Sequence, residues 1–413
     1  SAVALPTGDP LGERSNAQNA RVPAFNQCRS FAGSCPGTSN GHGAKLGGGA
    51  PIGAKLRSRH DSSLTLICVV VEAKDGYGYS MPHFDTVTGL PFANEQLYFP
   101  HELSAWAPRM AHKGGYEAAC ASLAPHARSL RVLAMTTQGM VVLTSDGSTP
   151  RRAADIGPAV EEAESVLFGG VDSSGVARFI AILDSQEDWG ALVEGTHAPA
   201  ATSVAPADPQ WLSLRYEAAL FEAADCSSCA RALALLRWHE RTRYCSRCGG
   251  ELQHENGGEA QRCVQCDCLE YPRQDPAVIV AITDEEDRLL LAHNRSWKPR
   301  FMSLIAGFVE AGEAPEHAVV REAKEEASLD VKEVRYVATQ PWPFPRSVMI
   351  GFTGKVSGTP DPSPDMEEVD AMKWMTRAEL IDAVNSGELE IPTHTAIARM
   401  MIDTWLHAEG DAL

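Results

Sequence analysis

The chain has 413 residues, 44% of them hydrophobic and 22% charged, a composition typical of two or three globular domains. It contains no run of about 18 apolar residues, so a membrane-spanning helix is not expected. The formal net charge of −18 argues against a general nucleic-acid-binding surface, because such surfaces gather Lys and Arg. The 11 cysteines and the lack of an apolar secretory segment predict a reducing compartment. We therefore expect an intracellular, cytoplasmic protein, with import into a plastid, mitochondrion or peroxisome left open.

The first half of the chain predicts a tail followed by a small domain. Residues 1–60 are rich in Gly, Ser, Ala and Pro and carry bases but few acids, which is typical of a disordered tail or a transit segment. Residues 62–215 alternate short apolar runs with turns, which indicates an α+β domain used for packing or dimerisation. Residues 216–243 place apolar residues at helical spacing and predict one linking helix. Within 62–215, the expected strands are Leu64–Glu72, Leu130–Ala134, Met140–Thr144 and Phe179–Leu183, and the expected helices are Tyr116–Leu123 and Ala159–Leu167.

A cysteine cluster follows the linking helix, in residues 244–271. Cys245 and Cys248 form one Cys-x-x-Cys pair, and Cys263 and Cys266 form a second. Two such pairs predict tetrahedral zinc, and four thiolates leave no open coordination position. We therefore expect a zinc ribbon with one structural zinc per chain. Three further possibilities stay open: Cys268 in place of Cys266, His254 as a weaker substitute, and a role for the Cys226 and Cys229 pair, which we interpret as incidental.

The most informative pattern is a helix that carries clustered carboxylates. Glu322, Glu325 and Glu326 lie three and four residues apart, so they share one helical face. Such carboxylates repel one another unless a cation lies among them, and Mg²⁺ or Mn²⁺ takes carboxylates together with phosphate oxygens. Pro315 suits the first turn of this helix, and Val319, Val320, Ala323 and Ala327 form an apolar stripe that can seat it on a sheet.

The residues around this helix resemble the Nudix box. Gly307, Glu313 and the run from Arg321 to Glu326 stand at the spacing of that motif, with Ser328 where the box usually has Gly. The resemblance implies a Nudix α/β/α sandwich with a mixed sheet over residues 272–410. It also implies that Glu322, Glu325 and Glu326 are catalytic metal ligands, that the backbone carbonyl of Ala306 faces the metal, and that Arg321 pairs with Glu313. Glu368 is expected to add a further carboxylate, with Glu367 as the alternative.

Thirteen residues beyond the box, Thr339–Ser347 resembles the signature of the NADH pyrophosphatase family. Its alternating prolines exclude a central strand, because proline donates no ladder hydrogen bond. We expect a stiff wall beside the substrate. The resemblance implies the following substrate-binding residues: Gln340, Pro341, Trp342, Pro343, Phe344, Pro345, Arg346 and Ser347 from the signature, with Arg215, Tyr271, Phe308, Glu368 and Ala398 from other segments.

The resemblance implies a homodimer that hydrolyses NADH to reduced nicotinamide mononucleotide and AMP, and NAD⁺ to the oxidised mononucleotide and AMP. Removal of a NAD cap from RNA by the same site is the first alternative. ADP-ribose and dinucleoside polyphosphates are further substrate options, against which the proline-rich wall argues. A catalytically inactive nucleotide-sensing module is an alternative of another class. Such a module is expected to lose box glutamates, and none is lost here.

Overall fold

The computed structural model describes residues 90–93, 97–99, 101–105, 107–122, 126–144, 147, 149–194 and 209–408. The predicted tail and the predicted strand Leu64–Glu72 lie outside the described residues. The chain divides into two compact units, Ser1–Tyr79 and Ser80–Leu413, and every element below belongs to the second. Within the described ranges, no helix combines the length and apolar character needed to cross a bilayer.

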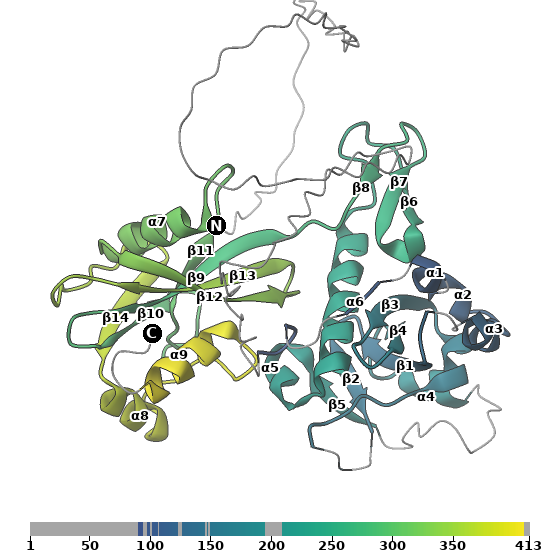
Figure 1. Ribbon diagram of the computed structural model, residues 1–413, viewed down its shortest axis with the longest axis horizontal. Coiled ribbons are helices and arrows are strands. Elements are labelled where there is room, and N and C mark those ends of the chain that lie inside the picture. Colours follow the sequence, from purple (N-terminus) through teal and green to yellow (C-terminus); the bar gives the residue numbers. More distant parts are fainter. Residues whose placement is uncertain are drawn as a thin grey trace, which may run out of the picture. The chain divides into compact units, whose positions relative to one another are not determined.

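Five of the described strands form the sheet of the N-terminal part, in the order β3-β4-β1-β2-β5 (Figure 1). β1 and β4 run parallel, and the other pairs are antiparallel. Alternate residues of β1 enter two cores, one beneath the short helices and one beneath α6. The bounds are β1 Ser129–Thr136, β2 Met140–Leu143, β3 Ser165–Val171, β4 Val176–Leu183 and β5 Gln210–Ser213; the short helices are α1 His101–Ser104, α2 Ala107–Met110, α3 Gly115–Ser122, η1 Gly157–Glu162 and α4 Trp189–Glu194.

Most of the expected elements in this part are confirmed, but Ala159–Leu167 is not a helix. The strands expected at Leu130–Ala134, Met140–Thr144 and Phe179–Leu183 are β1, β2 and β4, and the helix expected at Tyr116–Leu123 is α3. Residues 157–162 instead form the 3₁₀ turn η1, and the chain then enters β3. β3 is buried along nearly its whole length, and such a continuous apolar run lacks the alternation that distinguishes a strand from a buried helix.

The segment 216–243 is also not one helix. It consists of α5 (Leu214–Glu217), the 3₁₀ turn η2 (Ala218–Leu220) and α6 (Ala223–Arg241). Phe221 is extended, and the backbone on either side of it bonds to Arg151. Glu222 then caps α6, because its carboxylate accepts the N–H groups of Ala224 and Asp225. The pairing with a distant strand end interrupts a helix that the local pattern favours.

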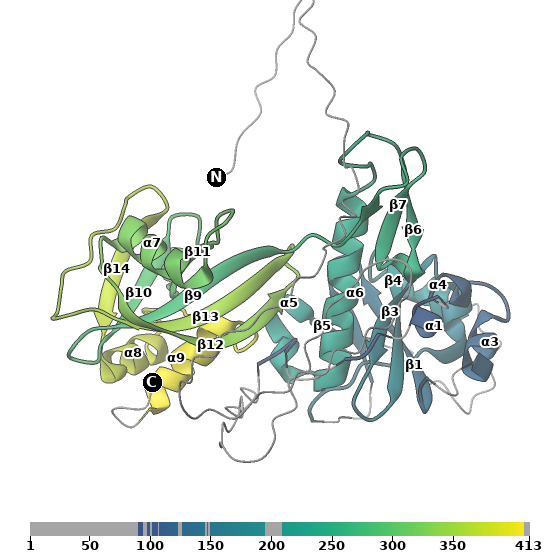
Figure 2. The ribbon, with the colours of Figure 1, turned by 45° about the horizontal axis from the view of Figure 1, so that its top comes forward.

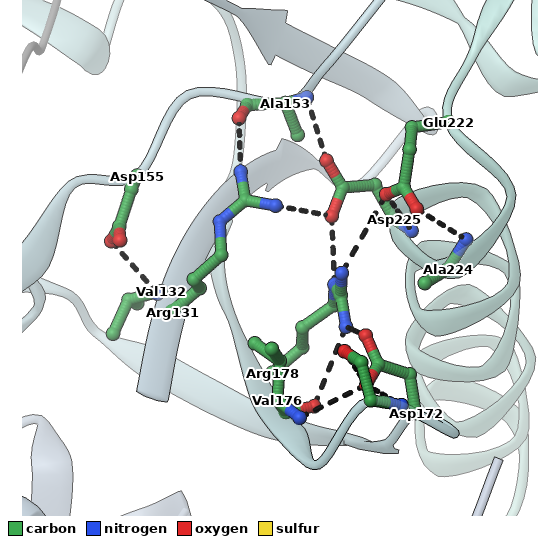
Figure 3. A network of polar contacts seen from close by, with 11 residues as sticks. Arg131, Val132, Ala153, Asp155, Asp172, Val176, Arg178, Glu222, Ala224 and Asp225 are labelled. Carbon is green, nitrogen blue, oxygen red and sulfur yellow. Dashed lines mark hydrogen bonds and ion pairs between the residues drawn. The ribbon is translucent and has the colours of Figure 1, made fainter. Parts of the chain in front are cut away.

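A buried polar network fastens α6 to the sheet (Figure 3). Asp225 of α6 is fully buried, and its carboxylate accepts hydrogen bonds at 2.7 Å from both Arg131 of β1 and Arg178 of β4. Its second oxygen accepts the backbone N–H of Ala153 at 2.9 Å. Arg178 also donates to the buried Asp172. Every one of these charges has a partner of opposite sign, which is the condition under which buried charge is tolerated.

The ribbon is a small sheet in the order β6-β7-β8. β6 (Leu252–Glu255) and β7 (Ala260–Cys263) are joined by the turn η3 (Asn256–Gly258), and β8 is Leu269–Glu270. Its core contains little besides Leu252 and the cysteines. A sheet with so few apolar side chains needs another source of stability, and a metal bound by the cysteines would supply it.

The C-terminal part is an α/β/α sandwich with a mixed sheet, as expected (Figure 2). The strand order is β12-β13-β9-β10-β14, and β11 pairs with β9. β13 and β9 are parallel, whereas the other pairs are antiparallel. α7 packs on one face, whereas α8 and α9 pack on the other. The bounds are β9 Asp275–Thr283, β10 Leu289–Asn294, β11 Ile305–Phe308, α7 Pro315–Ala327, β12 Lys332–Trp342, β13 Ser347–Lys355, β14 Val369–Met375, α8 Arg377–Asn385 and α9 Ile397–His407.

Candidate active site

The carboxylate helix is α7, and it begins where the sequence predicts. Pro315 occupies its first turn, and Ala318, Val319, Ala323 and Ala327 are buried against the sheet. Val320, which was expected in the same apolar stripe, is instead 40% exposed. Ser328 ends the helix in the left-handed conformation with φ 57°. Glycine adopts this conformation without strain, which explains why the box usually has Gly there. Here the N–H of Ser328 still bonds to the carbonyls of Ala323 and Lys324, so the departure from the motif preserves the helix exit.

Arg321 joins the loop, the strand and the helix of the site. Its guanidinium donates two parallel hydrogen bonds to Glu313, at 2.8 and 2.9 Å, so the expected pair is confirmed. It also donates to Glu322 at 2.8 Å, to Glu325 at 3.1 Å and to the carbonyl of Phe308 at 2.8 Å. The hydrogen bonds from Arg321 lower the pKa of Glu313 to about 2. One planar cation therefore fixes the box loop relative to the helix.

Glu322 lies directly against the strand β11. A methyl group on Gly307 would stand 1.9 Å from its carboxyl carbon, so only glycine leaves room for this carboxylate. Glu326 is 7% exposed, and burial, followed by the charges of Glu322 and Glu368, raises its pKa to about 8. A divalent cation among these groups would offset the repulsion between the carboxylates, which adds to the effect of burial on this pKa.

Glu325 differs from the other two box glutamates because its side chain is 61% exposed and turned to Arg321. Among the described residues, no three carboxylates of this cluster have oxygens within 4.8 Å of one another. One nitrogen of Arg321 bonds to the carboxylates of both Glu322 and Glu325. The glutamates therefore do not surround a cation on all sides. A cation bound to them would keep coordination positions for the phosphate oxygens of a substrate.

The further carboxylate expected after the box is better assigned to Glu368 than to Glu367. The charge of Glu368 is among the main causes that raise the pKa of Glu326, as is that of Asp365. The turn before β14 is organised by Asp365, whose carboxylate accepts the N–H groups of Glu367, Glu368 and Val369. Asp365 is not among the residues predicted from the sequence, although an Asp shortly before a pair of acids is a signal for such a turn.

The proline-rich segment forms the end of β12, a turn at 343–346 and the start of β13. β12 is an edge strand, and an edge accommodates Pro341. Three rings gather here: Phe92, Trp342 and Phe344 have centroids 5.0 to 6.3 Å apart. The guanidinium of Arg215 lies 5.8 Å from the ring of Phe344, so this predicted residue does lie at the wall.

Two predicted contacts are buried on the α9 side and need correction. Gln340 is completely buried, its amide nitrogen donates to the carbonyls of Pro91 and Thr395, and its oxygen accepts the N–H of Ile397. It therefore holds the wall in place instead of facing a substrate. Ala398 is 4% exposed and belongs to the core beneath α9, so its side chain is not open to a substrate.

The sheet register brings the wall and β11 to the same end of the domain. Phe308 pairs with Ala277, Ala277 with Met349, and Met349 with Gln340. This row crosses four strands, roughly 14 Å at the usual strand spacing.

Phe308 is 60% exposed and Tyr271 is 65% exposed, so both offer open rings. Ala306 is exposed two residues before Phe308 on β11.

The four predicted zinc ligands meet in the ribbon. The sulfur atoms of Cys245, Cys248, Cys263 and Cys266 all lie within 4.8 Å of one another. Backbone N–H groups of Arg247, Gly250 and Gln265 donate to three of the sulfurs at 3.4 Å, a pattern that stabilises thiolates. Cys268 stays outside this group and accepts from Arg247 at 3.3 Å. Cys226 and Cys229 are buried in α6 and belong to no metal-ligating group among the described residues.

Comparison with known proteins identifies the C-terminal part. The NUDIX domain family matches residues 273–394. The chain carries a NUDIX domain. It is 39% identical over 188 residues to "NAD-capped RNA hydrolase NudC" of Mycobacterium bovis, which covers 43% of this chain and 59% of that protein. It is 35% identical over 189 residues to the human "NAD-capped RNA hydrolase NUDT12", covering 43% of this chain and 41% of that protein. The chain thus spans about half the length of the curated relatives it matches.

Proposed function

We propose that the chain hydrolyses the diphosphate bridge of NADH and NAD⁺ with the help of Mg²⁺ or Mn²⁺. The observation that carries this proposal is the carboxylate of Glu322 laid against Gly307, beside the buried Glu326, in a NUDIX domain. The open rings of Phe308 and Tyr271 support a substrate with flat bases at its ends.

Three glutamates of the box and two groups outside it would hold the cation. Glu322, Glu325, Glu326, Glu368 and the carbonyl of Ala306 are the oxygen donors that a hard divalent cation prefers. When bound, that cation neutralises the diphosphate and lowers the pKa of water. The water oxygen attacks one phosphorus, the bridging oxygen leaves with the other phosphate, and the two protons of water end on the two products or in solvent. The products are AMP and the nicotinamide mononucleotide.

Removal of a NAD cap from RNA is the second candidate function. Two relatives carry that activity in their names. The bond broken is the same, and the RNA would leave with a 5′ monophosphate. The acidic net charge argues against tight nonspecific RNA binding, so the cap itself would supply most of the recognition.

The ribbon supports a third proposal, one structural zinc per chain held by its four central cysteines. The sulfur positions and their N–H donors fit zinc, which takes four thiolates in a tetrahedron. The homodimer and the cytoplasmic location stay predictions.

Hydrolysis of NADH with Mn²⁺, followed by chromatographic separation of AMP, tests the main proposal. Glu326→Gln is expected to lower kcat/KM by roughly 100-fold or more, as losses of transition-state electrostatics do. Glu325→Gln is expected to lower it in the same direction. Glu316→Gln is the matched control, because Glu316 is an exposed glutamate of the first turn of the same helix. Equal rates in all four proteins would refute the proposal, and binding of NADH without turnover in the wild type would favour an inactive sensing module.

A further inference from the structure

The segment that leads into β14 has a proline at every second position. Prolines stand at 360, 362 and 364, and they alternate with Asp361, Ser363 and Asp365. Proline fixes its own φ and restricts the residue before it to extended conformations, so this segment is stiff. Only the residues between the prolines have a backbone N–H group to donate. The sequence therefore leaves hydrogen-bond donors at alternate positions of a stiff segment.

Two of those donors bond to the end of α7. The N–H of Ser363 donates to the carbonyl of Ala327 at 2.9 Å. The N–H of Asp365 donates to the carbonyl of Glu326 at 3.1 Å. The last carbonyls of a helix have no partner within the helix, so these bonds satisfy groups that α7 itself leaves open. The segment is therefore fastened to the helix that carries the box glutamates.

Asp365 extends this connection to Glu368. One oxygen of its carboxylate accepts the N–H of Glu368 at 3.1 Å. The same oxygen accepts the N–H groups of Glu367 and Val369 at 3.0 and 2.9 Å, which closes a tight turn. Since the backbone N–H of Asp365 bonds to Glu326, two hydrogen bonds join the backbones of Glu326 and Glu368 through this single aspartate.

The end of β10 supports the same turn from another side. Arg295 donates its backbone N–H to the carbonyl of Glu368 at 3.0 Å, and its guanidinium donates to the carbonyl of Met366 at 2.7 Å. Met366 has a φ of 63°, a conformation that a residue with a side chain keeps only where its surroundings hold it. The turn that carries Glu368 is therefore held both by Asp365 and by Arg295.

We infer that Asp365 is a positioning residue of the metal site. It fixes the separation between the carboxylates of Glu326 and Glu368, and it thereby raises the affinity of the site for a divalent cation. The inference rests on the proposed function in taking these two glutamates as ligands of the cation. Glu368 needs such support because it is exposed and lies on a turn, whereas Glu326 is buried on a helix. A ligand that is already held in place loses less entropy when the ion binds.

Binding of Mn²⁺ in the absence of any nucleotide tests the inference. Mn²⁺ is titrated into the full chain, and the free ion is followed by its electron paramagnetic resonance signal. The thiolates of the ribbon favour softer ions, so the titration reports the carboxylates. Asp365→Ala is expected to raise the Kd about tenfold, the lower end of the loss that follows removal of a group that orients metal ligands. An unchanged Kd in this variant overturns the inference.

Two controls accompany this variant. Asp361→Ala is the matched control, because it removes an exposed aspartate of the same segment that takes no part in these bonds. Its Kd for Mn²⁺ is expected to equal that of the wild type. Melting temperatures from circular dichroism establish that each variant is folded before its Kd is compared.

The conservative variant Asp365→Asn separates the hydrogen bonds from the charge. The side-chain oxygen of Asn accepts backbone N–H groups in turns of this kind, so the Kd is expected to stay within about twofold of the wild-type value. A Kd as weak as that of Asp365→Ala would mean that the negative charge of Asp365 acts on the cation. That result contradicts a positioning role.

A double variant shows whether the effect passes through Glu368. Glu368→Gln is expected to weaken Mn²⁺ binding, and adding Asp365→Ala to it is expected to cause no further loss, because the ligand to be positioned is already absent. If the second substitution weakens binding as much in this background as in the wild type, Asp365 acts by another route and the inference is wrong. An unchanged Kd in Glu368→Gln alone has the same meaning.

These outcomes are distinguishable from those for the proposed function. A chain that binds Mn²⁺ through Asp365 and Glu368 but does not hydrolyse NADH refutes the proposed function and leaves the positioning role standing. A chain that hydrolyses NADH, and whose Asp365→Ala variant binds Mn²⁺ as tightly as the wild type, supports the proposed function and refutes the positioning role.

Discussion

Gly307→Ala is the most direct test of how the site is built. The added methyl carbon would stand 1.9 Å from the carboxyl carbon of Glu322 and 2.0 Å from one of its oxygens. Ordinary contact begins at 3.4 Å, so the carboxyl carbon has to retreat by about 1.5 Å. A displacement of about 1 Å at a reacting centre costs on the order of 100-fold in rate, and we expect at least that loss in kcat/KM for NADH.

The same substitution is expected to leave the fold intact. Gly307 is not in the left-handed region, so alanine meets no backbone strain there, and the clash is with the end of a flexible side chain. Gly190→Ala is the control, because it adds the same methyl group where nothing lies within 4 Å. Rates come from steady-state assays with Mn²⁺, and melting temperatures come from circular dichroism. Wild-type kcat/KM in Gly307→Ala would refute the placement of Glu322 as a metal ligand.

Three further predictions concern the ribbon and the N-terminal part. Cys266→Ser is expected to lower the zinc content below about one per chain, whereas Cys268→Ser keeps it, as metal analysis of the purified proteins can check. Asp225→Asn is expected to cost about 3 kcal/mol in the free energy of unfolding by urea, because Arg131 and Arg178 lose the fully buried counter-charge that they share, although Arg178 keeps its bond to Asp172. Burial lowers the pKa of His239 to about 4, below the value near 6.5 that a histidine has in the unfolded chain. Between these two pH values His239 is protonated in the unfolded state and neutral in the folded state. Stability should therefore fall as pH decreases from about 6.5 to 4, and His239→Gln should show a shallower fall in melting temperature over that range.

The sequence predicted best those parts of the site in which metal binding fixes the spacing of residues along the chain. Four thiolates around one ion require two close pairs, and the ribbon brings those four cysteines together. Carboxylates one helical turn apart must share a face, and α7 presents them beside Gly307. In both cases the partners lie within a short stretch of chain, so local geometry was enough.

The parts that the sequence did not predict depend on partners far along the chain. The helix is broken before α6 because Phe221 pairs with Arg151. The residues around Phe221 carry no local signal for this pairing. Gln340 stands in a motif that implies substrate contact, yet its amide bonds to Pro91, which is 249 positions away. Such contacts are set by tertiary packing, which a single sequence does not display.

The burial of Gln340 has a consequence for protein engineering. Its one amide links the wall to three separate backbone positions, at Pro91, Thr395 and Ile397. Transplanting only the proline-rich loop into another scaffold of this kind would leave that amide buried without partners, at a cost of about 1–3 kcal/mol for each unmet group. A successful graft would have to carry the start of α9 and the strip around Pro91 along with the loop.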